Sequence, residues 1–122
     1  MKIGKAFSFS SGHHLPLVPD RHPCKEPHGH NYCCWVVILG DHADNEGMVM
    51  DFFDLEKIVW PILEPLDHHN LNDVQGLANP TAENICQYIF TRLHSKLMEM
   101  GGPRLTLVRL YETDFCYAEM KL

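Results

Sequence analysis

The sequence lacks an apolar run that is long enough to cross a bilayer. A membrane-spanning helix needs roughly 18 consecutive apolar residues, and no such run occurs among the 122 residues. The first residues, MKIGKAFSFSSGHH, also lack the apolar region of a secretory signal peptide. We therefore expect a cytoplasmic protein with no membrane partner.

Basic residues are few and do not cluster. Ten lysines and arginines stand against 16 acidic side chains, which gives a formal net charge of −6. Proteins that bind nucleic acid usually carry a basic stripe, so we expect no nucleic-acid partner. An anionic small molecule remains possible as a substrate, because a local site can override the net charge.

Cysteine pairs with the CxxC spacing are also absent. The five cysteines are scattered as Cys24, Cys33, Cys34, Cys86 and Cys116. This spacing excludes the CxxC pairs of zinc ribbons and of thioredoxin-type sites. The apolar fraction of 45% is enough for an ordinary hydrophobic core. We expect a single domain over residues 1–122 that needs no disulfide framework.

The hydrophobic pattern predicts six elements in the order ββααββ. The predicted strands cover 2–9, 28–40, 104–112 and 115–121, and the predicted helices cover 52–64 and 81–100. Pro61 should kink the first helix or end it near Trp60, because proline donates no backbone hydrogen bond. The order is typical of an α+β fold, in which a four-stranded antiparallel sheet carries two helices on one face.

The second predicted strand is apolar on both faces. One face carries Cys33, Trp35, Val37 and Leu39, and the other carries Cys34, Val36 and Ile38. An antiparallel sheet with one solvated face should instead alternate apolar with polar residues. We expect the helices to cover one face and another copy of the chain to cover the other.

Histidines are abundant, and two of them form the motif His28-Gly29-His30. In a strand these side chains lie on one face, about 6.5–7 Å apart, so they can share a metal ion. His13 reaches the same end of the sheet if the first two strands pair as a hairpin. Three histidines with an open fourth position are typical of catalytic zinc. Two hydrogen-bonded surface histidines are the alternative interpretation, and His14 is an alternative to His13.

Three other residues are candidates for chemistry. Cys24 lies four residues before His28, and a thiol beside a dication is suited to act as a base or nucleophile. Asp67 precedes His68, and a carboxylate partner fixes the tautomer of an imidazole and raises its basicity. Glu112 ends a predicted strand, where it can accept two hydrogen bonds from a planar amidine-like edge. The alternatives are an inert loop cysteine, a turn-capping aspartate and a solvated glutamate.

Six segments resemble, in their order and spacing, the 6-pyruvoyl-tetrahydropterin synthase family: FSFSSGHHLP, CKEPHGHN, GMVMDF, LDHHNLND, NPTAEN and YET. The Cys-x3-His-Gly-His spacing and LDHHNLND are most similar to the bacterial 6-carboxy-tetrahydropterin synthases of queuosine biosynthesis. The resemblance implies a tunnelling fold, in which trimeric barrels stack in pairs as a homohexamer. It also implies a zinc-dependent lyase that converts 7,8-dihydroneopterin triphosphate to 6-carboxy-5,6,7,8-tetrahydropterin, acetaldehyde and triphosphate.

The same resemblance implies roles for individual residues. They are zinc ligation by His13, His28 and His30, catalysis by Cys24, Asp67 and His68, and pterin binding by Glu112, Thr81 and Thr113. Asp51 either orients a zinc ligand or caps the helix that follows it. Lys25 and Arg21 are candidates for binding the triphosphate, although neither is assigned.

The reaction outcome stays open at this stage. Glu26 lies between Cys24 and His28, and some relatives with an altered product have a glutamate near this point. One alternative is a 6-pyruvoyl-tetrahydropterin synthase, which eliminates the triphosphate and retains the side chain. Others are a zinc hydrolase with His68 or Glu112 as the base, and a non-catalytic module that binds a pterin or a metal.

Overall fold

The strands and helices follow the predicted order ββααββ in a computed structural model that describes residues 1–122. The strands are β1 (Lys2–His13), β2 (His28–Leu39), β3 (Arg104–Thr113) and β4 (Cys116–Lys121), and the α-helices are α1 (Phe52–Leu63) and α2 (Ala82–Met100). Short 3₁₀ helices η1 (Pro23–Lys25), η2 (Glu64–Leu66) and η3 (Leu71–Asp73) lie in the connections.

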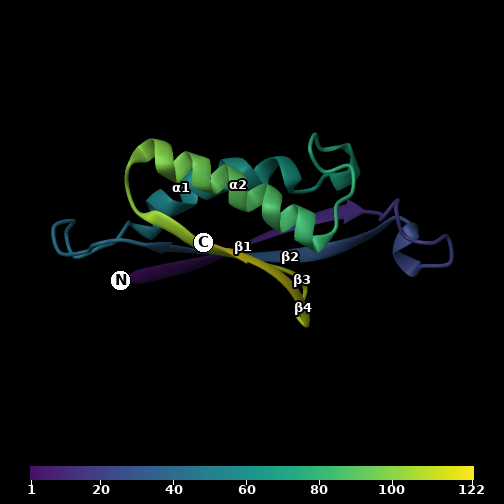
Figure 1. Cartoon of the computed structure of the whole chain (residues 1–122), viewed down its shortest axis with the longest axis horizontal. Coiled ribbons are helices and arrows are strands. Elements are labelled where there is room, and N and C mark those ends of the chain that lie inside the picture. The colour runs from purple at the N-terminus through teal and green to yellow at the C-terminus, as the bar shows by residue number, and fades with distance from the viewer.

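The four strands form one antiparallel sheet in the order β1-β2-β3-β4. Both α-helices lie on the same face of this sheet, as Figure 1 shows. The predicted α+β architecture is therefore confirmed. The sheet pairs neighbours along the chain, so the strands that carry His13, His28 and His30 lie side by side.

The core lies between the sheet and the two helices. Helix α1 buries Leu55, Val59 and Leu63, which are spaced four residues apart and so lie on one side of the helix. Helix α2 buries Ile85, Ile89, Leu93 and Leu97 at the same spacing. The sheet contributes Tyr32, Cys34, Val36 and Ile38 from β2. Burying a leucine or isoleucine side chain contributes about 1.5–3 kcal/mol, so these rows hold the helices on the sheet.

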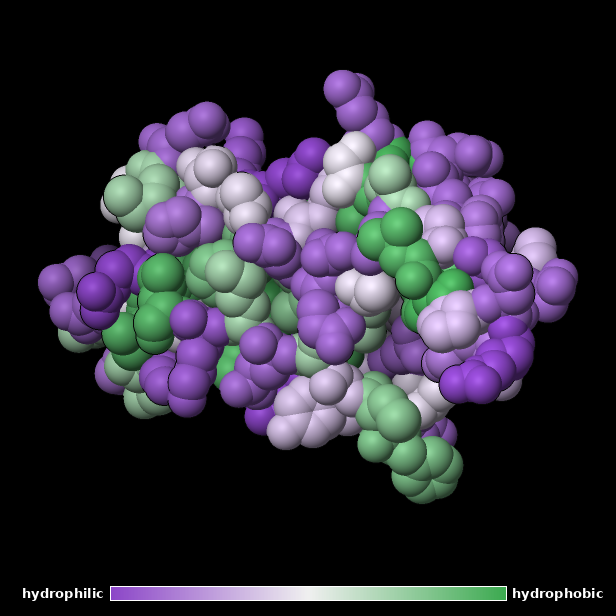
Figure 2. All heavy atoms as spheres, turned by 45° about the vertical axis from the view of Figure 1, so that its right-hand side comes forward, coloured by the Kyte–Doolittle hydropathy of each residue, from purple (hydrophilic) through white to green (hydrophobic).

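The opposite face of the sheet has no helix over it (Figure 1). Trp35 on β2 is 42% exposed, and Tyr117 on β4 is 54% exposed. Hydrophilic residues cover most of the surface seen in Figure 2, but apolar residues interrupt it in several places. Strand β2 is thus apolar on both faces, as predicted, while this chain covers only one of them. No helix has the length and apolar character that crossing a membrane requires.

Strand β1 is longer than predicted, because it continues past residue 9 to His13. The segment after η2 supplies hydrogen-bonding partners on the outer edge of this extension. The His68 N–H donates to the Ser10 carbonyl at 2.6 Å, and the Gly12 N–H donates to the His69 carbonyl at 3.1 Å. Residues 10–13 thus pair with β2 on one edge and with this distant segment on the other, and hydrophobic alternation reveals neither partner.

Of the two predicted effects of Pro61, an end of α1 near Trp60 was wrong. Pro61 lies inside the helix, which continues to Leu63. Proline removes one backbone hydrogen bond, but the buried Leu63 packs the last turn against the core. Packing of that apolar residue outweighs the missing bond.

Both α-helices begin with side-chain caps. Asp51 Oδ1 accepts a hydrogen bond from the Phe53 N–H at 2.7 Å, and Thr81 Oγ1 accepts one from the Asn84 N–H at 3.1 Å. Asp51 makes no hydrogen bond to a histidine, so its capping role is the one that the structure supports. Helix α2 ends at Gly101, whose φ of 68° is the left-handed conformation that favours glycine.

Candidate active site

Pairing of β1 with β2 brings the three predicted metal ligands together. His13, the last residue of β1, lies directly opposite His28, the first residue of β2, and His30 lies opposite Ser11. Cross-strand partners point to one face of a sheet, as do residues i and i+2 of a strand. The three imidazole rings therefore project together, with ring centroids 4.5, 4.9 and 5.1 Å apart.

Two backbone carbonyls fix the orientation of two of these rings. The His13 Nδ1–H donates to the Pro80 carbonyl at 2.8 Å, and the His28 Nδ1–H donates to the Glu26 carbonyl at 2.8 Å. In a neutral imidazole this leaves Nε2 as the lone-pair atom. The two Nε2 atoms lie 2.9 Å apart. Two lone pairs facing each other at that distance repel, unless a cation lies between them.

The Nε2 atom of His30 completes the group. It is buried and has no hydrogen-bond partner in the chain. One nitrogen from each of the three histidines lies within 4.8 Å of the others. In a tetrahedral zinc site with bonds of about 2.0–2.1 Å, ligand atoms lie about 3.3 Å apart. The donor set and its buried, unpartnered nitrogen therefore fit a metal ion.

Burial also keeps these rings in the form that binds metals. Removal from water lowers the pKa of His13 and of His30 below the usual value for histidine. A neutral imidazole is the form that ligates a metal. The site therefore holds its ligands ready for binding at neutral pH.

Glu112 lies beside the histidines. Its carboxylate oxygens are 4.0 Å from His13 Nε2 and 3.8 Å from His30 Nε2. Tyr32, at the base of the cluster, is buried, and its pKa is raised by that burial and by the charge of Glu112. Glu112, the predicted pterin anchor, thus lies next to the three histidines, where its negative charge also favours a bound cation.

Asp67 and His68 form a hydrogen-bonded pair at the outer edge of β1. Asp67 Oδ1 is 2.9 Å from His68 Nδ1 and accepts the Ser10 N–H at 2.9 Å. The hydrogen bond from Ser10 lowers the pKa of Asp67. His68 has a left-handed φ of 57°, which is rare for a residue other than glycine. This backbone conformation leaves its side chain 82% exposed while Asp67 orients the ring.

A polar cavity of about 390 Å³ connects the Asp67–His68 pair with the cluster of three histidines. It is lined by Ser10, Ser11, Gly12, Gly29, His30, Asn31, His68 and His69. None of these side chains is apolar, and Gly12 and Gly29 are cross-strand partners. The cavity thus places a candidate metal ligand and a candidate proton carrier around one polar space.

Cys24 lies in η1, within the loop that joins β1 to β2. Its thiol is half-buried and free, and it makes no hydrogen bond to His68 within the chain. The structure therefore brings the three histidines, Glu112 and His68 together. Cys24 makes no hydrogen bond to them and is connected to them only along the chain, through the loop. Its predicted catalytic role stays a prediction.

The remaining candidates have structural contacts. Thr81 caps α2, and Thr113 Oγ1 accepts the Phe115 N–H at 3.2 Å in the turn between β3 and β4. His14 is not part of the cluster; Asn72 clamps its backbone by accepting the His14 N–H at 3.0 Å and donating to its carbonyl at 2.9 Å. Of the two adjacent histidines, His13 is the one that joins His28.

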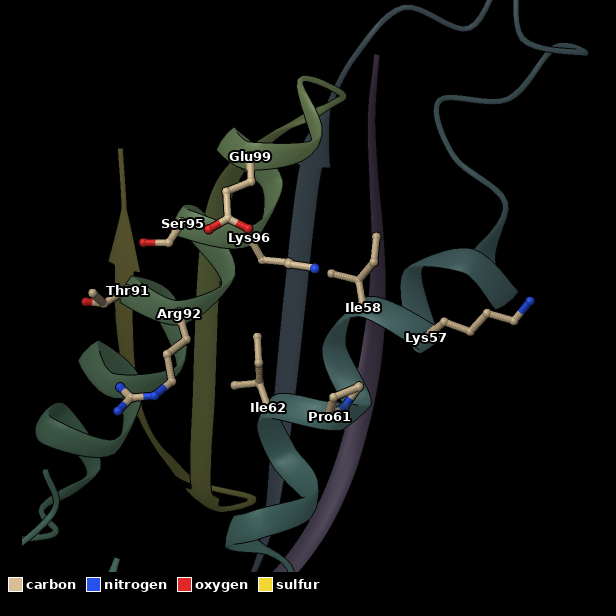
Figure 3. Close-up of a pocket in the computed structure, with 9 residues that line it drawn as sticks. All are labelled: Lys57, Ile58, Pro61, Ile62, Thr91, Arg92, Ser95, Lys96 and Glu99. Atoms are coloured by element: carbon tan, nitrogen blue, oxygen red, sulfur yellow. The ribbon is translucent and has the colours of Figure 1, made fainter. Parts of the chain in front are cut away.

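A larger cavity, about 640 Å³, lies elsewhere, between α1 and α2 (Figure 3). Its lining contains no histidine or cysteine and only one carboxylate, that of Glu99. Figure 3 shows Lys57 pointing away from this groove. The Arg92 guanidinium lies 3.4 Å from the centre of the Tyr88 ring. The groove therefore lacks the groups found around the histidine cluster.

Sequence reasoning missed the groups that orient the histidines. These are the backbone carbonyls of Pro80 and Glu26, which accept from His13 and His28. Asn72 was missed as well, although it belongs to LDHHNLND and asparagine often pairs with backbone groups. The identity of its partner depends on the fold.

Comparison with known proteins matches the histidine-bearing fold to one family. The family described as 6-pyruvoyl tetrahydropterin synthase matches residues 2–122. A 6-carboxy-5,6,7,8-tetrahydropterin synthase of Synechocystis is 39% identical over 116 residues, covering 91% of this chain and 85% of that protein. The human 6-pyruvoyl tetrahydrobiopterin synthase is 36% identical over 127 residues, covering 93% and 86%.

A solved structure has the same fold. The 6-pyruvoyl tetrahydropterin synthase of Caenorhabditis elegans superimposes with a TM-score of 0.88 at 29% identity, covering 100% of this chain and 95% of that one. The match extends over both helices and the whole sheet. With the family match over residues 2–122, it shows that this chain belongs to the 6-pyruvoyl tetrahydropterin synthase family.

Proposed function

We propose that this chain is a zinc-dependent 6-carboxy-5,6,7,8-tetrahydropterin synthase. Its reaction would convert 7,8-dihydroneopterin triphosphate and water to 6-carboxy-5,6,7,8-tetrahydropterin, acetaldehyde and triphosphate. The observation that carries the proposal is the convergence of three imidazole nitrogens beside a polar cavity that also contains His68. The Synechocystis relative, which bears this enzyme name at 39% identity, supports the choice of product.

We assign the zinc ion to His13, His28 and His30. Three neutral imidazoles without a fourth protein ligand are typical of catalytic zinc, because a position stays open for substrate. When bound there, the ion would supply Lewis-acid stabilisation of negative charge on the side-chain oxygens of the substrate. The carbonyls that hold two of the rings would keep the ligand geometry fixed.

We assign the proton transfers to Cys24, Asp67 and His68. The Cys24 thiolate would remove a proton from the substrate side chain. Asp67 accepts the Nδ1–H of His68, which leaves Nε2 free to accept or return a second proton. The exposed ring of His68 lies at the polar cavity, where a bound side chain is within its reach. Together these transfers would move hydrogen from the side chain to the pterin ring, which goes from the 7,8-dihydro to the 5,6,7,8-tetrahydro state as the side chain is oxidised.

We assign pterin recognition to Glu112, with Thr81 and Thr113 lining the pocket. A carboxylate accepts two parallel hydrogen bonds from the 2-amino-4-oxo edge of a pterin. Glu112 lies within 4.0 Å of two cluster nitrogens, so anchoring the ring there would bring the substrate side chain to the histidines. Both threonines also cap local backbone, so their contribution to binding would be secondary.

We infer that the working form is a homohexamer of two stacked trimeric barrels. The sheet face opposite the helices is uncovered, and Trp35 and Tyr117 are exposed on it beside the Arg109–Glu119 ion pair. Large exposed apolar patches are typical of association surfaces. All five cysteines are free thiols, which fits the reducing cytoplasm that we propose as the location.

Mass analysis of the product tests the activity. Purified, zinc-loaded protein would be incubated with 7,8-dihydroneopterin triphosphate, and we expect the 6-carboxy product with one acetaldehyde per turnover. Cys24→Ala should abolish turnover and keep zinc, whereas Cys116→Ala, which removes an exposed thiol, should change neither. An unchanged substrate side chain with wild-type protein would reject the synthase assignment in favour of a non-catalytic binding module.

The second candidate product is 6-pyruvoyl-tetrahydropterin. The human relative that bears this activity in its name is 36% identical, close to the 39% of the Synechocystis protein, so identity alone does not separate the two reactions. The same mass experiment separates them, because this product retains all three side-chain carbons and releases no acetaldehyde.

A further inference from the structure

The loop that carries Cys24 is held by hydrogen bonds on both sides of that residue. The Cys24 N–H donates to Nδ1 of His22 at 3.0 Å, and the Cys24 carbonyl accepts the Leu15 N–H at 2.8 Å. The loop runs from the end of β1 to the start of β2, and η1 is its only helical turn. The position of the thiol therefore depends on what holds this short turn against the rest of the loop.

Lys25 ties the turn to the other half of the loop. Its Nζ donates to the carbonyl of Pro16 at 2.7 Å and to that of Val18 at 3.2 Å. The Asp20 carboxylate lies 3.6 Å from the same nitrogen. An ammonium group has three donors and no acceptor. Two of these donors are therefore used by backbone carbonyls, and the exposed Asp20 carboxylate lies close enough only for an ion-pair contact.

The turn is also connected to the histidine cluster. The Glu26 carbonyl, immediately after η1, accepts the His28 Nδ1–H at 2.8 Å. The turn is thus bonded to the first half of the loop through Lys25 and to His28 through the Glu26 carbonyl. A shift of the turn would move the thiol relative to the cluster and would disturb the orientation of the His28 ring.

We propose that Lys25 is a positioning residue that fixes the η1 turn carrying Cys24, and that it does not bind the triphosphate. The proposal rests on the proposed function for the catalytic role of Cys24. To bind a phosphate with all of its donors, Lys25 would have to release the two backbone carbonyls that hold the turn. Arg21, by contrast, is exposed and makes no hydrogen bond or ion pair in the chain, so it stays available for an anion.

The kinetic test compares Lys25→Met with Lys25→Arg in zinc-loaded protein. Methionine keeps most of the apolar stem and loses the donors, so we expect kcat to fall about 10- to 100-fold, as for a misplaced catalytic group. KM for dihydroneopterin triphosphate should stay within about twofold. Arginine donates to two carbonyls and should recover most of kcat. The control is Lys96→Met, because Lys96 is exposed on α2 and makes no ion pair.

The opposite kinetic pattern would overturn the proposal. If Lys25 contacted the triphosphate, Lys25→Met would raise KM about tenfold or more and leave kcat near its wild-type value. Binding of unphosphorylated 7,8-dihydroneopterin would then be unaffected, because that compound lacks the contact. Because a shifted turn would also disturb the His28 ring, kcat is compared per bound zinc in each variant.

A second measurement does not require turnover, so it separates this proposal from the proposed function. In hydrogen exchange, the Leu15 amide should exchange faster in Lys25→Met than in Lys96→Met, because its acceptor is the Cys24 carbonyl. Alkylation of Cys24 by iodoacetamide should change in rate in the same variant. Unchanged exchange and alkylation would refute the positioning role, even if the wild-type protein proved to be an active synthase.

Discussion

Replacing His30 by leucine should have opposite effects on stability with and without zinc. The Nε2 atom of His30 is buried and has no partner in the chain. An unsatisfied buried polar group costs about 1–3 kcal/mol, and an apolar side chain of similar size does not carry that cost. In metal-free protein we therefore expect His30→Leu to be more stable than wild type by about 1–3 kcal/mol.

Zinc should reverse this order. A ligand that binds only the folded state stabilises it by about 4 kcal/mol at a free concentration of 1,000 times its Kd. His30→Leu retains only His13 and His28, so most of that gain should be lost. Combining the two effects, wild type should exceed His30→Leu by roughly 1–3 kcal/mol in excess zinc, which reverses the order seen without metal.

Urea unfolding at one protein concentration measures both quantities by linear extrapolation. Each protein would be unfolded in a chelator and again in excess zinc. His14→Leu is the matched control, because His14 is adjacent to His13 but contacts Asn72 only through its backbone. It should keep the full gain from zinc. If His30→Leu were less stable than wild type by the same amount in both conditions, the inference of a metal site from its unpartnered nitrogen would be wrong.

Three further substitutions test the other parts of the site and the surface. The Ser10 hydrogen bond keeps the pKa of Asp67 below its unfolded value of about 3.9. The ionised Asp67 carboxylate therefore contributes its full stabilisation of the folded state above that pH, and this contribution is lost as the pH falls through the folded pKa. Asp67→Asn should therefore flatten the dependence of unfolding free energy on pH in urea titrations below about pH 5, and an unchanged slope would contradict this. Glu112→Gln should weaken pterin binding in calorimetry by about 10- to 100-fold, since hydrogen bonds to a charged group contribute about 1.5–3 kcal/mol. Its zinc content should stay the same. An undiminished affinity for the pterin would argue against Glu112 as the anchor. Trp35→Glu places a charge on the uncovered sheet face, so native mass should fall below that of wild type, and an unchanged mass would show that this face is not the association surface.

Local sequence patterns predicted most of the fold because they reflect local physics. The four-residue spacing from Ile85 to Leu97 predicted α2, and Thr81 and Gly101 marked its ends. The length of β1 was not predictable in this way, because Ser10 and Gly12 are bonded to a segment more than fifty residues later. Alternation describes which face a residue occupies, and it does not show whether an edge has a partner.

The same distinction explains what could be predicted of the site. His28 and His30 lie on one face because of strand geometry alone, and His13 joins them once β1 and β2 pair. The rings are aimed by backbone carbonyls, which every residue has and which no motif can identify. Lys25 shows the consequence for charged side chains. From sequence it was a candidate for an anion, whereas in the fold its ammonium group donates to the carbonyls of Pro16 and Val18. The role of a loop lysine is therefore decided by the backbone groups within its reach, and only the three-dimensional structure identifies those groups.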